Sequence, residues 1–164
     1  MKNLGSSVLL FVFLCSGMAR AAEFLVLDIG ADSNIPVIVM TDSSSITAGE
    51  TGRKLATLLS VHDAGEWDER KMEVDCTTQR WRELGGVRHG VGDNVFAEAP
   101  DDNWTDLQSG SAELRVRDAV CAWPDKRPSA DKIVTGVLHD ILDQASAAAS
   151  KMVEEKQRER DDDK

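Results

Sequence analysis

The stretch RKMEVDCTTQRWRELGGVR, residues 70–88, carries the strongest structural pattern in this chain of 164 residues. Met72, Val74 and Cys76 alternate with charged residues, and this period of two predicts a strand with one apolar and one polar face. The polar residues 77–79 suit the turn of a hairpin, after which apolar residues return. We therefore expect two antiparallel strands joined by a short turn, with a cysteine where the first strand ends.

Neighbouring segments predict further strands of the same sheet. Residues 23–28, 35–41 and 54–62 are short and apolar, and turn-forming residues separate the first two. In the second strand of the hairpin, residues 80–88, two adjacent glycines suggest a β-bulge. Together these segments predict an antiparallel sheet.

The hydrophobic period changes after Trp104. Apolar residues recur at helical spacing within residues 112–123, and either Ser109 or Ser111 can cap the first free N–H groups of a helix. Such a helix would end near Cys121 and lie against the sheet. The predicted fold class is α+β: an antiparallel sheet with a helix packed on it.

The first residues have the pattern of a signal peptide. An apolar run over residues 8–18 is too short to span a bilayer, and the small-x-small residues 19–21 suit a signal peptidase. We place the signal peptide at residues 1–21. Lipid attachment at Cys15 is the alternative, but the bulky residues 13–14 before it are untypical of a lipid-modified cysteine. No later segment is apolar enough to be an integral membrane helix.

Removal of this leader would leave two cysteines, Cys76 and Cys121. An exported chain lies in an oxidising compartment, where such a pair usually forms a disulfide bond. Closing the intervening loop stabilises a domain by about 3–4 kcal/mol on the loop-entropy model. We therefore predict a Cys76–Cys121 disulfide that joins the helix to the sheet.

The net charge of the chain limits the classes of partner that it can bind. After Lys2 and Arg20 leave with the leader, 17 basic residues face 29 acidic ones, which gives a net charge of −12. Such a surface repels nucleic acid and anionic lipid headgroups. Neither is therefore an expected partner, whereas basic proteins remain candidates.

The last part of the chain looks separate from the domain at residues 22–123. Prolines bracket a polar linker at residues 124–128, and residues 129–164 read as one amphipathic helix with a charged, frayed tail. Its apolar residues are spaced as in a short heptad seam, which is formed by Val134, Leu138, Ile141, Ala145, Ala148 and Met152. The seam packs either on the sheet or on a second copy. We expect a separable helix and a monomer or weak homodimer.

The order of these features resembles the surface-adhesin protein E family of Gram-negative bacteria, over residues 23–122. The matching segments are 42–46, Gly49, 71–76, Arg80, Arg82, 104–105, 109–111 and 119–121. The resemblance implies an antiparallel sheet joined to a helix by the disulfide. It also implies an exported, non-enzymatic adhesin that binds host matrix or plasma proteins.

The sequence contains no pattern that predicts a catalytic, cofactor-binding or metal site. The alternating oxygen ligands of residues 28–34 resemble a calcium loop, but the glycine and glutamate that such a loop needs are missing. We predict an exported binding or adhesion protein of the periplasm or outer cell surface, with no cofactor. The alternative is a periplasmic structural or accessory subunit that docks on an envelope protein through its C-terminal helix. The candidate partner-binding residues are Val134, Leu138, Ile141, Met152, Trp67 and Trp123.

Overall fold

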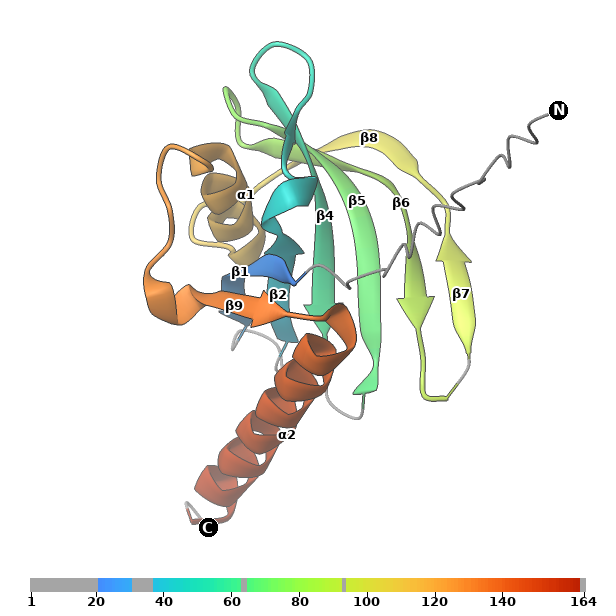
Figure 1. Ribbon diagram of the computed structural model, residues 1–164, viewed down its shortest axis with the longest axis vertical. Coiled ribbons are helices and arrows are strands. Elements are labelled where there is room, and N and C mark those ends of the chain that lie inside the picture. The colour runs from blue at the N-terminus through green and yellow to red at the C-terminus, as the bar shows by residue number, and fades with distance from the viewer. Residues whose placement is uncertain (1–20, 31–36, 63–64, 93, 163–164) are drawn as a thin grey trace, which may run out of the picture.

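The computed structural model describes residues 21–30, 37–62, 65–92 and 94–162 (Figure 1). The predicted signal peptide, except for its last residue, and most of the calcium-like loop lie outside these residues. The described part of the chain forms one antiparallel sheet of nine strands with two α-helices of 11 and 25 residues. The predicted α+β fold class is confirmed.

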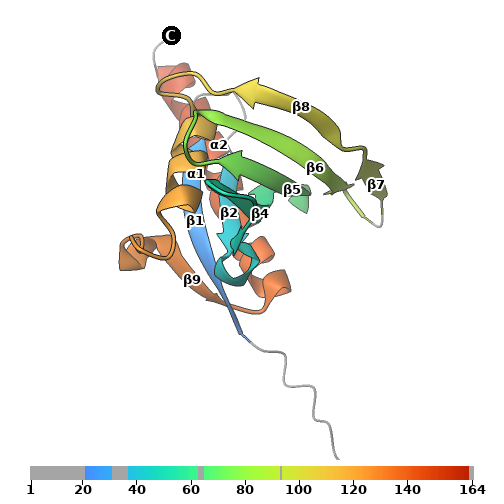
Figure 2. The ribbon, with the colours of Figure 1, turned by 90° about the horizontal axis from the view of Figure 1, so that it is seen from above.

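The strands are β1 (Ala22–Gly30), β2 (Val37–Asp42), β3 (Thr47–Ala48), β4 (Arg53–Val61), β5 (Trp67–Asp75), β6 (Arg80–His89), β7 (Val95–Glu98), β8 (Asp101–Asp106) and β9 (Ile133–Gly136). The helices are α1 (Ala112–Ala122) and α2 (Leu138–Asp162), with single 3₁₀ turns at Ser43–Ser45 and Ala130–Lys132. Across the sheet the order is β7-β6-β5-β4-β2-β1-β9, while β3 pairs with β4 and β8 pairs with β6. Figure 2 shows β7 and β8 at one margin of the curved sheet.

The hairpin predicted from residues 70–88 is confirmed. Strands β5 and β6 pair along their lengths, from Trp67 opposite His89 to Asp75 opposite Arg80, with the turn between them. Between the pairs Arg70–Gly86 and Met72–Glu83, β6 contains one extra residue, which is the predicted bulge.

The two glycines of the bulge are required by its geometry. Gly85 has a φ of +108°, which side chains rarely adopt. A Cβ atom at Gly86 would lie only 2.4 Å from the carbonyl oxygen of Glu69 on the neighbouring strand. Both positions therefore exclude a side chain.

The helices cover opposite faces of the sheet, and alternate residues of β1 and β4 show this by belonging to different cores. On β1, Leu25 contributes to the core beneath α1 and Phe24 to the core beneath α2. Leu58 and Leu59 of β4 divide in the same way. The period-two alternation of the strands thus supplies two apolar layers instead of one.

The expectation of one helix over residues 129–164 is wrong in its first part. Ile133–Gly136 is a strand, β9, which pairs with β1 at the edge of the sheet, and α2 begins only at Leu138. The β-branched run from Ile133 to Thr135 favours a strand, and the open edge of β1 offers it a partner. Val134 therefore does not belong to a helical seam.

The prediction of a heptad seam is also wrong, as the packing of α2 shows. Its buried residues are Ile141, Ala145 and Ala149, which step by four, whereas Ala148 is exposed. Ile141 and Ala145 pack against the sheet. This is the pattern of a helix lying on its own domain, so the linker at residues 124–128 does not separate two independently packed units.

Candidate binding site

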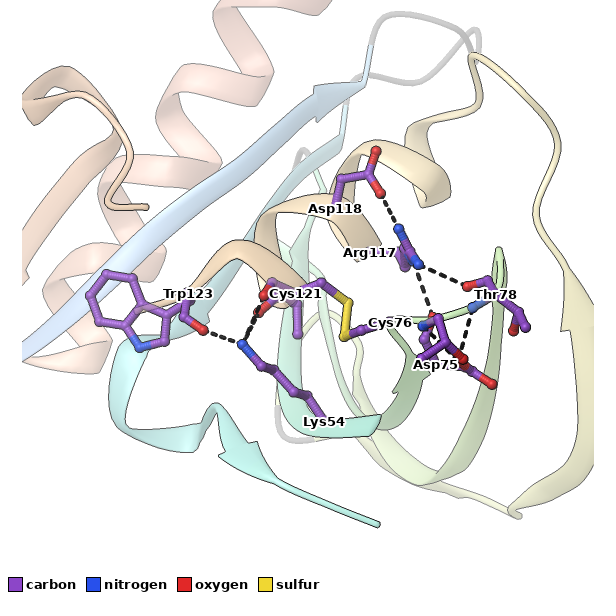
Figure 3. The surroundings of a disulfide bond; sticks show 10 residues. Lys54, Asp75, Cys76, Thr78, Arg117, Asp118, Cys121 and Trp123 are labelled. Carbon is purple, nitrogen blue, oxygen red and sulfur yellow. Dashed lines mark hydrogen bonds and ion pairs between the residues drawn. A yellow bond between two sulfur atoms is a disulfide. The ribbon is translucent and has the colours of Figure 1, made fainter. Parts of the chain in front are cut away.

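The disulfide fixes α1 to the end of β5. Cys76 follows the strand directly and Cys121 lies in the last turn of the helix, with their Cα atoms 5.5 Å apart (Figure 3). Ser111 caps the other end of α1 by accepting a hydrogen bond from the backbone N–H of Leu114, at 3.1 Å. The predicted disulfide and the serine cap are confirmed.

Lys54 supports the same end of the helix. Its Nζ donates to the carbonyl oxygens of Val120 and Cys121, at 3.3 and 2.9 Å, and to that of Trp123 (Figure 3). The last carbonyl groups of a helix have no partner within it and carry partial negative charge. The ammonium group therefore satisfies them and holds α1 against β4.

Asp75 and Arg117 hold the turn on which the disulfide is anchored. Oδ1 of Asp75 accepts from the hydroxyl and backbone N–H of Thr77 and from the backbone N–H of Thr78, at 2.7–3.0 Å. The Thr77 hydroxyl, with these N–H groups, holds the pKa of Asp75 well below its usual value. Arg117 donates to the carbonyl oxygens of Asp75 and Thr78, which ties the turn to α1 (Figure 3).

A hollow of about 360 Å³ lies at the start of α1, on the sheet face that carries this helix. Its apolar lining comes from strands β2, β4, β5 and β6 and from the start of α1. These residues are Val39, Leu58, Met72, Trp81, Ala112 and Val116. The volume is at the lower end of the range of ligand pockets, which suits one or two side chains.

The rim of the hollow is polar, and three of the four charged side chains that line it are carboxylates. Alternate residues of β8, namely Asp101, Asn103 and Thr105, line it on one side. Glu83 of β6, Glu113 in the first turn of α1, Ser60 of β4 and Arg70 of β5 supply the rest of the polar lining. The carboxylates of Asp101 and Glu113 belong to exposed residues, and the side chain of Glu83 retains 24 % of its exposure.

An ion-pair network adjoins the hollow through Arg70. Arg70 Nη2 lies 3.5 Å from the buried carboxylate of Asp68, and its Nη1 and Nε lie 3.9 and 3.6 Å from Glu83 and Glu98. Arg88 contacts Asp68 and Glu98 at 3.2 and 2.9 Å, and these two carboxylates raise the pKa of its guanidinium. Three carboxylates share two guanidinium groups, so this cluster adds no free positive charge to the hollow.

His62 borders the same network. Its Nε2 lies 3.2 Å from Oδ2 of Asp68. A second, smaller hollow is lined by His62, Asp68, Arg70 and Arg88. It adjoins the hollow beside α1, because Arg70 lines both.

Trp104 turns to the opposite face of the sheet from its neighbours on β8. The guanidinium groups of Arg53, Arg80 and Arg82 lie 4.9–5.3 Å from the centre of its ring. Buried Glu73 accepts from Arg82 Nε at 2.6 Å and lies 3.6 Å from Arg53. Cation–π contacts and ion pairs hold these side chains together on that face of the sheet. Trp104 is therefore not part of the hollow, which lies on the other face.

The candidate partner-binding residues predicted from the sequence are not brought together at this site. Ile141 is buried, and Val134 and Met152 pack at the margin of the same core. Leu138 is 37 % exposed, at the start of α2. These four residues lie on the α2 side of the sheet, and three of them are used in packing.

The two tryptophans among the predicted residues lie apart from each other. Trp67 is stacked on His89, with ring centres 3.7 Å apart, at the margin of the α2 core. Trp123 packs against the α1 core, with Arg127 5.2 Å from its ring centre. Neither lines the acidic hollow.

Sequence reasoning missed the hollow, although one signal for it was present. No lysine or arginine occurs between Arg88 and Arg115. The same interval contains six acidic residues: Asp93, Glu98, Asp101, Asp102, Asp106 and Glu113. A one-sided run of charge of this length predicts an acidic surface. Only the fold shows that β8 and α1 place it around an apolar floor.

Two kinds of feature are absent from the described residues. These residues contain no group of three or more His, Cys, Asp and Glu residues that could hold a metal ion. None of the helices in the described ranges is long and apolar enough to cross a membrane.

Fold and site define a class: a disulfide-bonded α+β protein with a helix on each face of one curved sheet and an acid-rimmed hollow beside α1. Comparison of the chain with family models, curated proteins and solved structures found no match.

Proposed function

We propose that this chain is an exported, non-enzymatic binding protein whose partner is another protein, of the host matrix or plasma or of the cell envelope. The observation that carries the proposal is the hollow itself. It combines an apolar floor with exposed carboxylates at a free margin of the sheet. Hydrophobic contact at the centre and polar groups at the rim are what protein interfaces require.

The surroundings of the hollow support a protein partner. Strands β7 and β8 pair on one side only in the part of the chain that the structure describes. Val95 and Phe96 of β7, and Val91 in the loop before it, are 58–60 % exposed. Apolar side chains beside an unpaired strand edge favour contact with another polypeptide.

A combined display and binding experiment tests this proposal. Intact cells are treated with protease and probed with antibody, and the purified chain is assayed on immobilised host matrix proteins, plasma proteins and envelope fractions. We expect protease-sensitive display and saturable binding to a protein. Confinement to the periplasm would contradict the adhesin role, and turnover in a broad substrate screen would contradict a non-enzymatic one.

The geometry of α2 favours a second candidate, a periplasmic accessory subunit. In Figure 1 the far end of α2 projects beyond the sheet, and its residues after Val153 are mainly charged and exposed. A projecting helix can dock on an envelope protein without disturbing the sheet. Capture of one defined envelope protein by the full chain, lost when residues 154–164 are removed, would favour this candidate.

A further inference from the structure

We propose that the acidic hollow binds an extended basic segment of a partner protein, which adds a strand along β8 and inserts a lysine or arginine side chain over Trp81. This inference rests on the proposed binding function and names the chemistry of the partner. Its evidence is the floor of the hollow, the charge of its rim and the free edge beside it.

The floor suits the stem of a long basic side chain. Leu58 and Met72 are 5 % and 4 % exposed, and Trp81 is half-buried beside them. Lysine and arginine bury their methylene groups on such surfaces while keeping the charged end in a polar setting. The stem would therefore lie on the floor and its charge would reach the rim.

The rim supplies the complementary charge. Glu83, Asp101 and Glu113 line the hollow. Among the described residues that line it, Arg70 is the one basic side chain, and it is shared by Asp68, Glu83 and Glu98. An entering ammonium or guanidinium group would meet the exposed carboxylates of Asp101 and Glu113. An entering carboxylate would be repelled, and so would a second copy of this strongly acidic chain.

The edge beside the hollow offers backbone groups to an extended chain. β8 pairs only with β6 in the described ranges, so its outer N–H and C=O groups have no strand partner there. Peptides commonly bind by adding a strand to such an edge, with alternate side chains entering pockets. The side chains of β8 that line the hollow come from every second residue: Asp101, Asn103 and Thr105. A strand bound beside β8 would likewise direct every second side chain toward the hollow.

A labelled peptide of alternating lysine and valine tests the proposal by fluorescence anisotropy with the full, disulfide-bonded chain. We expect saturable binding that weakens as salt screens the charges. A peptide of alternating glutamate and valine should not bind. An N-methylated lysine–valine peptide, which cannot form strand hydrogen bonds, should bind about tenfold more weakly.

Matched variants locate the site. The triple variant Glu83→Gln, Asp101→Asn, Glu113→Gln should weaken binding about tenfold. The control Asp125→Asn, Glu155→Gln, Glu159→Gln removes the same charge at exposed positions elsewhere and should change it by less than about twofold.

A second pair of variants guards against an effect on folding. Thr105→Lys places a cation at the rim and should abolish binding, whereas Thr135→Lys, at an exposed position of β9 on the far edge, should not. All variants are compared by thermal unfolding before the titration, and only those that unfold like the wild type are interpreted.

Three outcomes would overturn the inference. They are equal binding of the acidic peptide, undiminished binding by the rim variants, and self-association that Thr105→Lys abolishes, which would make a second copy the occupant. If the triple variant still binds the protein captured by the wild type, the proposed function stands at another surface and this inference fails.

Discussion

At the residue scale, the ionisation of Asp75 is coupled to the fold. It is buried, and it accepts three hydrogen bonds from Thr77 and Thr78 in the turn that follows Cys76. These donors favour the ionised form, so the pKa of Asp75 is lower in the folded chain than in the unfolded one.

The sign of the resulting pH dependence follows from linkage. The unfolded carboxyl takes up a proton near pH 4, whereas the folded one does so only at lower pH. The stabilising contribution of Asp75 is therefore complete above about pH 4 and decreases as the pH falls toward the folded pKa.

Asp75→Asn should lower the free energy of unfolding at pH 7 by roughly 1–2 kcal/mol, because an amide accepts these hydrogen bonds less strongly. The difference from the wild type should shrink between about pH 4 and pH 2. Urea unfolding over this range measures it. Asp125→Asn, at an exposed position, controls for the loss of one charge, and a difference that persists unchanged at pH 2 would contradict the explanation.

At the scale of elements, the disulfide and its neighbours hold α1 on the sheet. The bond joins the end of β5 to the last turn of α1, where Lys54 and Arg117 contribute further hydrogen bonds. Cys76→Ser and Cys121→Ser remove the same constraint. Each should lower the free energy of unfolding by about 3–4 kcal/mol, and the double variant should lose no more than either alone.

Denaturant unfolding of the two single variants and the double variant under non-reducing conditions measures this cycle. Reduction of the wild-type protein should reproduce the loss. If the losses of the two single variants instead add in the double variant, the cysteines act independently and the disulfide is not their shared role.

The C-terminal elements should be indispensable to the domain. A chain that ends at Pro124 loses β9 and α2, and it exposes Phe24, Met40 and Val61, which are at most 3 % exposed in the whole chain. Burial of each such side chain contributes about 1.5–3 kcal/mol, so the loss is comparable with the stability of a small domain.

We expect this truncated chain to be unfolded or molten by near-ultraviolet circular dichroism. A chain that ends at Val153 keeps the buried stripe of α2 and should melt within about 2 °C of the full chain, because few contacts are lost. Cooperative melting of the Pro124 truncation at the full chain's temperature would show that α2 and β9 are dispensable.

At the scale of the whole molecule, charge and packing both favour a monomer. The sequence has a net charge of −10, and the apolar stripe of α2 lies on its own sheet instead of remaining free for a second copy. Sedimentation velocity at micromolar concentrations should give one species of monomer mass. A dimer that persists in high salt and is lost on truncation at Val153 would mean that the helix end is a self-association surface.

Several features of the fold followed from the sequence because they depend on local chemistry. Period-two alternation placed Met72 and Val74 on one face of a strand, adjacent glycines marked the bulge in β6, and Ser111 was one of two candidate caps for α1. The disulfide followed from the two cysteines that remain once the predicted leader is excluded.

Elements whose conformation depends on distant partners could not be read in the same way. The polar segment of β8 has little strand propensity of its own and is a strand because β6 pairs with it. Residues 133–136 lie near a helical pattern, and the open edge of β1 makes them a strand. Glu73 and Asp75 lie on the face of β5 that was predicted to be polar, yet both are buried, and hydrogen bonds from Arg82 and from the turn residue Thr77 satisfy their carboxylates.

The sequence by itself determined the strand alternation, the cysteine pair and the acidity of the interval from Arg88 to Arg115. These are properties of neighbouring residues or of simple counts. Only the tertiary structure decided that this acidity surrounds Trp81 and Met72, because the hollow is assembled from five strands and a helix that are distant along the chain. Its shape depends on their packing, and packing is not encoded in any one segment.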